Sequence, residues 1–378
     1  MPPDLPLPPN PGPMVGENTV TFRLDDPDHA LGAVRLYQEV RIPGDRLDFR
    51  HDGDSWLLEI ERPDVDRMEY LFELTHADGA TVTLTDPANP RRVAGAFGDK
   101  SVLELPGYRR PDWLSRPGPA GRRRELMVIP RSLDGQVAVT LWSPAGLDDD
   151  TPAPLLVVHD GPEYDRLAGL PAYLSALVAA GDLPPVRAAL LGPGHRDERY
   201  SADGAYTRAL CLAVFPRLRS EVATSALIGV GASLGALAML HAQRQQAGCL
   251  DALFLQSGSF FHPRYDAHER RFSRYSRVVR SVDAVLRSAG HPTPVPTVMT
   301  CGTLEENLAN NRIMARALAA QGYDVSLREV RDVHSYTAWR DAFDPWLTGL
   351  VREVARTAEA ARRDEDARRN DTARREHA

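Results

Sequence analysis

One pentapeptide, Gly-Ala-Ser-Leu-Gly at positions 231–235, places the strongest constraint on the fold of this 378-residue chain. It follows an apolar run, Ala226–Val230, and precedes a second apolar run, Leu237–Leu240, with the character of a helix. Glycine at both ends lets the backbone turn sharply between a strand and a helix, so that a serine between them is held exposed at the edge of a sheet. This is the pattern of a nucleophile elbow, and Ser233 is the candidate nucleophile. Glycine is common in this chain, at 28 residues, so the pentapeptide needs support from the sequence around it.

Two later strand-like runs supply the partners that a serine nucleophile needs. The run Pro296–Cys301 leads to Glu305, and the run Val325–Val330 leads to His334. A serine hydroxyl is a weak nucleophile until a base removes its proton, and the base must be held by a carboxylate. The order serine, acid, histidine is that of the α/β-hydrolases. We therefore expect three loops at consecutive strand ends, where open α/β sheets bind their ligands.

Each of these residues also has an ordinary structural interpretation. The chain holds 11 histidines, and His334 is singled out only by its place after the last strand signal. Glu306 lies next to Glu305 and could cap a helix that begins at Asn307, where the positive end of the helix stabilises a carboxylate. Glu305 is the preferred acid, and Glu306 and Asp332 stay open as alternatives.

Two backbone amides are candidates for an oxyanion hole. One belongs to Leu234, the residue after the nucleophile, and the other to the loop after the central strand. In that loop Pro162 has no N–H, which leaves Gly161 or Glu163. We favour Gly161, because a glycine allows the backbone to approach a substrate closely. The alternative is that His159-Asp160-Gly161 is only a tight turn.

The first third of the chain has the pattern of a β domain. Residues 1–16 form a Pro-rich arm, with seven prolines in the first 13 positions, which we expect to be extended and disordered. Short apolar or alternating segments then recur between turn residues, as in a small β-sandwich spanning residues 17–115. They are Val20–Leu24, Val34–Tyr37, Trp56–Ile60, Tyr70–Phe72 and Thr81–Leu84. Residues 106–124, rich in Pro, Gly and Arg, indicate a linker.

A different pattern marks the segment 116–355. A leading hairpin is predicted at Leu126–Ile129 and Val137–Trp142, followed by a fully apolar central strand at Leu155–His159. Strands and helices then alternate, which predicts a mostly parallel sheet with helices on both faces. The later strands are Ala188–Leu191, Ala226–Val230 and Leu253–Gln256, and the helices are Leu170–Ala180, Ala205–Leu218 and Leu234–Ala247. Residues 356–378 form a charged tail, helical or disordered.

Composition limits the classes of function. The net charge of −7 argues against a nucleic-acid-binding protein. The three cysteines are scattered, which supports neither a disulfide framework nor a zinc site, and we expect no metal and no cofactor. No apolar stretch approaches the length of a membrane span, and the start lacks the pattern of a secretory signal. We expect a cytoplasmic protein without a membrane partner, and the sequence leaves self-association into a homo-oligomer open.

An arginine-rich segment, residues 264–280, follows the strand after the elbow. Arg270, Arg274 and Arg277 are spaced i, i+4 and i+7 and are expected on one helical face. Guanidinium groups there could bind an anionic substrate. The competing interpretation is a solvated, charged face, in a chain whose only lysine is Lys100.

Residues 155–350 resemble the enterochelin (enterobactin) esterase family of α/β-hydrolases. The resemblance rests on His159-Asp160-Gly161, the elbow at Ser233, the run Leu255–Phe261, Gly302 with Glu305, and His334 followed by Trp339-Arg340. Tyr70–Phe72 and Leu84–Pro90 resemble the immunoglobulin-like domain that precedes the hydrolase in such proteins.

The chain departs from the family pattern in three places. Ala236 stands where the family has a second glycine after the elbow, and His334 lacks the usual glycine and aspartate neighbours. The element Arg196–Tyr200 carries Arg199 where the family has an acid, which bears on the substrate more than on the reaction. Arg196, at its start, is a further candidate for substrate binding.

The resemblance implies a serine hydrolase that cuts ester or lactone bonds through an acyl-enzyme. In its best-known members the small-molecule substrate is a ferric siderophore. Transfer of the acyl group to another acceptor, hydrolysis of carbohydrate esters (feruloyl or acetyl), and a catalytically silent binding protein are the alternatives.

Overall fold

A computed structural model describes residues 12–40 and 42–376, and these residues form two compact units. The first, the β-unit, comprises the described residues up to Arg109 together with two later segments, Gly302–Glu305 and Arg331–Thr337. The second, the α/β-unit, comprises Arg110–Cys301, Glu306–Val330 and the chain from Ala338 onward. The two later segments of the β-unit carry the predicted acid and the predicted histidine.

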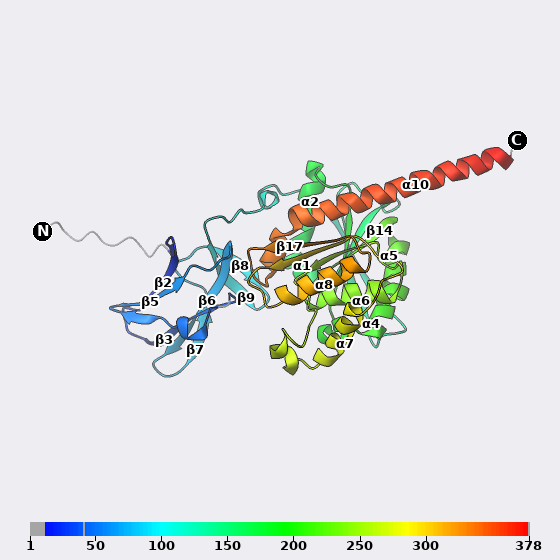
Figure 1. The fold of residues 1–378 in the computed structure, drawn as a ribbon. Helices are drawn as coiled ribbons and strands as arrows, with labels where there is room; N and C mark the ends of the chain where they lie inside the picture. Colours follow the sequence, from blue (N-terminus) through cyan, green and yellow to red (C-terminus); the bar gives the residue numbers. More distant parts are fainter. Residues whose placement is uncertain (1–11, 41, 377–378) are drawn as a thin grey trace. The chain divides into compact units, whose positions relative to one another are not determined.

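The β-unit contains two antiparallel sheets (Figure 1). One has the order β1 (Met14–Val15), β2 (Thr19–Asp25), β5 (Ser55–Glu61) and β4 (Arg50–Asp52). The other has the order β3 (Leu31–Gln38), β6 (Arg67–His76), β9 (Gly98–Glu104) and β8 (Arg92–Gly95), with β7 (Thr81–Leu84) paired to β6. Alternate residues of both sheets meet in one apolar core, and the five predicted strand segments lie within β2, β3, β5, β6 and β7. Most of the expected N-terminal arm lies outside the described residues, but β1 shows that its end pairs with β2.

The α/β-unit is built on an eight-stranded sheet. Its strands, in spatial order, are β10 (Arg122–Val128), β11 (Val137–Ser143), β13 (Arg187–Leu191), β12 (Ala153–Val158), β14 (Thr224–Ala232), β15 (Ala252–Gln256), β16 (Thr297–Gly302) and β17 (Val325–Val330). The first two strands form the predicted hairpin, and β13, β12, β14, β15 and β16 run parallel. Every residue of β12 is buried, as expected of a central strand covered on both faces.

Helices cover both faces of this sheet. The helix α6 (Leu234–Gln245) and the long C-terminal helix α10 (Thr348–Glu376) both contact β14, and Figure 1 shows them on opposite sides of the sheet. The other helices are α1 (Gly161–Arg166), α2 (Leu170–Ala180), α3 (Arg196–Tyr200), α4 (Gly204–Ala209), α5 (Phe215–Glu221), α7 (Tyr275–Leu286), α8 (Leu308–Ala320) and α9 (Tyr336–Asp341). The predicted helix Ala205–Leu218 is divided, because a π-helical turn at Leu210–Val214 separates α4 from α5.

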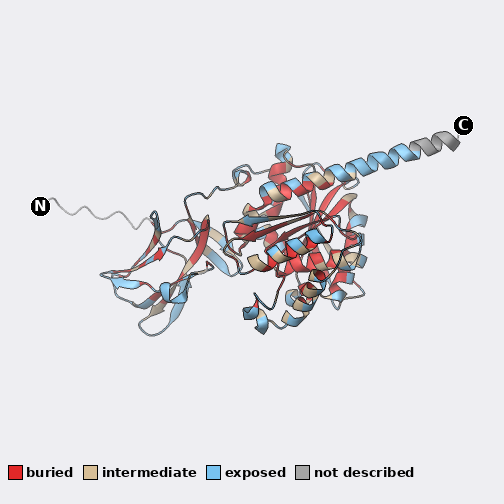
Figure 2. Ribbon diagram, in the orientation of Figure 1, coloured by how far each residue is buried: buried red, intermediate tan, exposed pale blue. Residues whose placement is uncertain are grey.

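The charged tail continues α10 rather than forming a separate element. Leu350, Val351 and Val354 bury the start of the helix against the sheet. From residue 359 to 369 every side chain is exposed, as the pale blue stretch of this helix shows in Figure 2. No helix within residues 12–40 and 42–376 is long and apolar enough to cross a lipid bilayer.

Candidate active site

Ser233 lies on a strained turn between β14 and α6. Its backbone has φ 55° and ψ −125°, a conformation that side chains other than glycine rarely adopt. A Cβ atom on Gly231 would lie 2.5 Å from the carbonyl carbon of Gly235, so the glycine at 231 is required for the two backbones to pass each other. The turn therefore has the geometry of a nucleophile elbow, as the pentapeptide predicts.

The neighbouring strand β15 and the loop after it fix this turn through the main chain. The Ser233 N–H donates to the Gln256 carbonyl at 2.9 Å, and the Ser233 carbonyl accepts from the Ser259 N–H at 3.1 Å. The two serine hydroxyls, Oγ of Ser233 and Oγ of Ser259, are 3.0 Å apart. The sequence places Ser259 after a strand next to the elbow, but nothing in the sequence indicates that its buried hydroxyl contacts the nucleophile.

The loop that carries Ser259 is itself held by two side chains. Asn311 accepts a hydrogen bond from the Gly258 N–H at 3.1 Å and donates one to the Gly258 carbonyl at 2.8 Å. Trp339 donates its indole N–H to Ser257 Oγ at 2.9 Å. The side chains that brace this loop are buried, so it forms a rigid support beside the elbow.

His159 connects the loop after β12 to the first turn of α6. Its Nδ1 is 3.0 Å from the Gly235 carbonyl and its Nε2 is 3.0 Å from the Tyr206 hydroxyl. A carbonyl only accepts, so Nδ1 carries the proton and Nε2 accepts from the tyrosine. Burial lowers the pKa of His159 to about 4, although the hydrogen bond to Gly235 acts in the opposite direction. His159 is therefore neutral and structural near pH 7.

The two amides predicted for the oxyanion hole lie at the first residues of two helices. Leu234 begins α6 and Gly161 begins α1. A Cβ at Gly161 would lie 2.3 Å from the Leu190 carbonyl carbon of β13. The glycine is required by packing against the neighbouring strand, whatever the substrate.

Glu305 and His334 form a direct hydrogen bond within the β-unit. Glu305 Oε2 is 2.9 Å from His334 Nδ1, and Glu305 Oε1 accepts from the Gly302 N–H at 2.8 Å. The side chain of Glu305 is 1% exposed and that of His334 is 37% exposed. Because a carboxylate only accepts, Nδ1 carries the proton and the lone pair lies on Nε2. This is the tautomer that a general base requires.

The two alternative acids have other partners. Glu306 is 2.9 Å from His268 Nε2, and Asp332 is 2.8 Å from Arg67. Glu306 also belongs to a group with His268 and Glu269 whose possible metal-ligand atoms lie within 4.8 Å of one another. All three are at least partly exposed, and the ion pair between His268 and Glu306 accounts for their proximity.

The three predicted arginines do not share one helical face. Arg270 lies in a short 3-10 turn, Ala267–Arg271, and α7 begins only after Arg274. The side chains of Arg274 and Arg277 both bind the Glu198 carboxylate. The hydrogen bond from Arg277 is the main cause that lowers the pKa of Glu198.

Arg196 is also engaged with an acid. Its Nε and Nη2 bind the two carboxylate oxygens of Asp160 at 2.8 and 2.9 Å. This bidentate pair connects the start of α3 to the loop that leads to Gly161.

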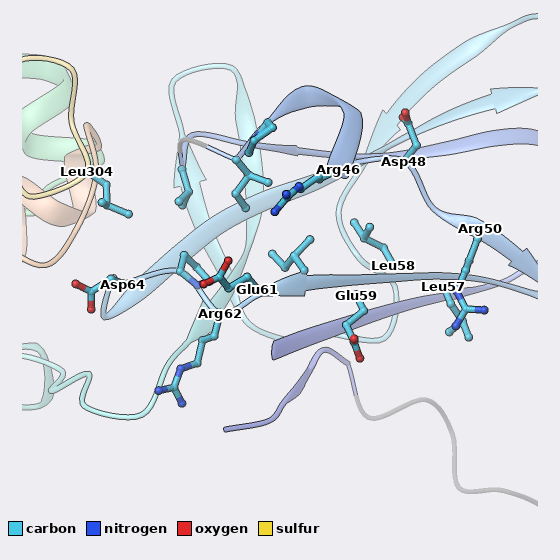
Figure 3. A pocket seen from close by; sticks show the side chains of 15 residues that line it. Arg46, Asp48, Arg50, Leu57, Leu58, Glu59, Glu61, Arg62, Asp64 and Leu304 are labelled. Atoms are coloured by element: carbon cyan, nitrogen blue, oxygen red, sulfur yellow. The ribbon is translucent and has the colours of Figure 1, made fainter. Parts of the chain in front are cut away.

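A groove of about 580 Å³ lies in the β-unit (Figure 3). It was not expected from the sequence, because its lining comes from separate strands and loops. Apolar residues form part of the lining beside side chains of both charges, which favours no single charge of ligand. The lining residues include Val40, Ile42, Ile60, Arg46, Glu61 and Leu304. Leu304 directly precedes the predicted acid.

Comparison with known proteins identifies the fold. No family matches the chain by sequence, and no curated protein is similar to it in sequence. The enterobactin esterase of Shigella flexneri, crystallised in the presence of enterobactin, aligns with a TM-score of 0.70 at 19% identity, over 91% of this chain and 96% of that chain. The chain has the fold of the enterobactin esterases.

Other solved structures agree with this assignment. The ferric enterobactin esterase of Salmonella typhimurium aligns with a TM-score of 0.68 at 19% identity, over 89% of this chain and 93% of that one. A ferulic acid esterase aligns with a TM-score of 0.52 at 15% identity, over 62% of this chain and 98% of that one. The predicted mostly parallel sheet with helices on both faces is present, and the resemblance seen in the motifs extends to the fold.

We expect Gly231→Ala to destabilise the protein by about 1–3 kcal/mol or more, because the new methyl group would overlap the backbone of Gly235. Gly349→Ala is the control, since a Cβ at this exposed position in α10 meets nothing within 4 Å. That change should stabilise the helix by about 0.5–1 kcal/mol. Thermal unfolding of the two variants measures both effects, and a tolerated alanine at 231 would contradict the close approach.

We expect the free energy of unfolding to fall as the pH drops from about 6.5 to 4. Between these values the unfolded chain protonates His159 and the folded protein does not, so acid favours the unfolded state. The shift from 6.5 to about 4 corresponds to about 3 kcal/mol. Thermal unfolding of the protein and of His159→Gln between pH 4 and 7 measures this dependence. The variant should show a shallower slope, and an equal slope would show that His159 is not the responsible group.

Proposed function

We propose that the protein is a serine esterase, with Ser233 as nucleophile, His334 as general base and Glu305 as the orienting acid. The observation that carries the proposal is the hydrogen bond between Glu305 and His334 Nδ1, which joins the two residues that the sequence predicts as acid and base. The strained elbow at Ser233 supports it independently. The three residues follow β14, β16 and β17 of one sheet, in the chain order of the α/β-hydrolases.

The proposed reaction follows from these roles. His334 Nε2 takes the proton of Ser233 as the hydroxyl oxygen attacks the ester carbonyl. The N–H groups of Leu234 and Gly161 stabilise the negative charge on the carbonyl oxygen, and Glu305 stabilises the imidazolium. The imidazolium then protonates the leaving alcohol, which departs and leaves an acyl-enzyme. Water, activated by the same histidine, releases the acid.

We further propose a small-molecule ester or lactone of the siderophore type as the substrate. The enterobactin esterase of Shigella flexneri was crystallised with enterobactin and with 2,3-di-hydroxy-N-benzoyl-serine, and such structures align with about nine-tenths of this chain. Within this proposal the β-unit corresponds to the immunoglobulin-like domain that the sequence predicts. The ferulic acid esterase aligns with only 62% of the chain, which makes a carbohydrate ester the second candidate.

We expect Ser233→Ala to lower kcat for an aryl ester by roughly four to six orders of magnitude, because no other oxygen replaces the attacking hydroxyl. It should also abolish labelling by a fluorophosphonate probe. Ser259→Ala is the matched control, since its hydroxyl lies 3.0 Å from that of Ser233 and it should retain labelling at Ser233. Mass spectrometry locates the adduct, and an adduct on Ser259 in the unmodified protein would overturn the assignment.

We expect Glu305→Gln to lower kcat by about 10²- to 10⁴-fold, because an amide can turn its NH₂ group toward Nδ1 and favour the wrong histidine tautomer. Glu306→Gln, one residue on, should stay within about twofold, since its carboxylate faces His268. Steady-state kinetics of both variants test this. The reverse order would transfer the orienting role to Glu306.

A further inference from the structure

The strand β6 begins with charged side chains that are buried, whereas charged side chains on the outer face of a sheet are ordinarily exposed. Its first four residues, Arg67–Tyr70, are all buried, whereas the outward-facing residues later in the strand are partly exposed. Met68 and Tyr70 point into the apolar core, so alternation directs Arg67 and Glu69 to the other face of the sheet. Arg67 is only 2% exposed, so this outer face is covered by another part of the β-unit.

The covering segment is Arg331–Thr337, the segment that carries His334. Arg67 Nη2 binds Asp332 Oδ2 at 2.8 Å, and Arg67 Nη1 binds Glu69 Oε1 at 2.9 Å. The second oxygen of Asp332 accepts from the Val333 N–H at 2.8 Å. Asp332 thus fixes the chain directly before His334 with both carboxylate oxygens. One oxygen binds Arg67 of β6, and the other binds the next backbone N–H in the same segment.

Further contacts hold the segment on both sides of the histidine. The Arg331 carbonyl accepts from the Asp66 N–H at 2.7 Å, and the Arg331 side chain binds Asp64 and Asp66. Val333 is 3% exposed and belongs to the apolar core of the β-unit. After the histidine, the hydroxyl of Thr337 is hydrogen-bonded to Glu69.

The charges in this cluster balance one another. Burial raises the pKa of Glu69, but the charges of Arg67 and of Lys100 together with hydrogen bonds outweigh it, and the net pKa lies below the ordinary value. Lys100, the one lysine of the chain, is 3.6 Å from Glu69. The orientation of the Arg67 guanidinium is fixed, because its two Nη atoms each bind a different buried carboxylate.

We infer that Arg67 is a positioning residue for His334: with Glu69, it fixes the loop of the histidine to strand β6 of the β-unit. This inference rests on the proposed function for its effect on activity. Its structural content is independent of that function, because it concerns the orientation of His334 toward Glu305. A histidine displaced by about 1 Å loses on the order of 10² in rate.

The test uses the full chain with Arg67→Met/Asp332→Asn, which removes the buried pair without leaving a lone charge. We expect kcat for an aryl ester to fall about 10²-fold with KM within about twofold, because the elbow at Ser233 and the amides of Leu234 and Gly161 lie outside this charge cluster. The single variant Arg67→Lys should have a kcat between those of the unmodified protein and the double variant. Lysine keeps the positive charge but lacks the planar geometry by which arginine binds two carboxylates.

A second readout needs no substrate. The proton on His334 Nδ1, held by Glu305 at 2.9 Å, is expected as a downfield proton NMR signal that His334→Gln removes. In Arg67→Met/Asp332→Asn this signal should shift or broaden. If Ser233→Ala leaves esterase activity intact, the proposed function fails, and the NMR signal still decides whether Arg67 positions the histidine.

Tyr70→Phe is the matched control for general destabilisation. Tyr70 lies on the same strand and loses a buried 2.6 Å hydrogen bond to Asp86, which takes no part in the contacts between β6 and the loop of His334. It should keep kcat and the NMR signal. An equal loss of kcat in Tyr70→Phe, or an unchanged kcat and signal in the folded double variant, would overturn the inference.

A milder variant covers the case in which the double variant does not fold. Thr337→Val removes one hydrogen bond to Glu69 and leaves every buried charge paired. It should lower kcat by a smaller factor and shift the same NMR signal. An unchanged kcat and signal in this folded variant would also overturn the inference.

Discussion

The backbone at residue 233 is the constraint around which the α/β-unit is organised. A serine at φ 55° is strained by on the order of 1–3 kcal/mol, and it persists only because its surroundings leave the chain no alternative. Gly231 and Gly235 pass within contact distance, which sets the angle between β14 and α6. Hydrogen bonds to Gln256 and Ser259 then tie the turn to the next strand. These neighbours together hold the strained turn, so the Ser233 hydroxyl has a fixed position.

The residues proposed for acid–base chemistry depend on a different set of interactions. Glu305 and His334 belong by their packing to the β-unit, although in the sequence they follow strands of the α/β sheet. Their orientation depends on the Gly302 amide and on the buried charges around Arg67. In the proposed esterase, the β-unit would therefore hold the orienting acid and the general base.

The sequence predicts those features that depend on local pattern. The elbow follows from two glycines and two apolar runs, and Glu305 and His334 follow from their places after strands, all of which are properties of short segments. Contacts between distant segments leave no such signal. Nothing in the sequence connects Arg67 with Asp332, 265 residues later, or assigns Ser259 to the hydroxyl of Ser233. The prediction that three arginines share one helical face is wrong for a related reason. Spacing implies a shared face only within one continuous helix, and α7 begins after Arg274.

The contacts of Arg277 give this residue a structural role at the same site. All three of its guanidinium nitrogens donate to the segment 198–201: Nε to the Ser201 carbonyl, Nη1 to the Glu198 carboxylate and Nη2 to the Glu198 carbonyl. That segment leads to α4, whose Tyr206 hydroxyl donates to His159, and His159 in turn holds the first turn of α6. For Arg277 to contact a substrate directly, it would have to give up hydrogen bonds that brace the support of the elbow. Selection of an anionic substrate by this arginine would therefore compete with the rigidity on which Ser233 depends.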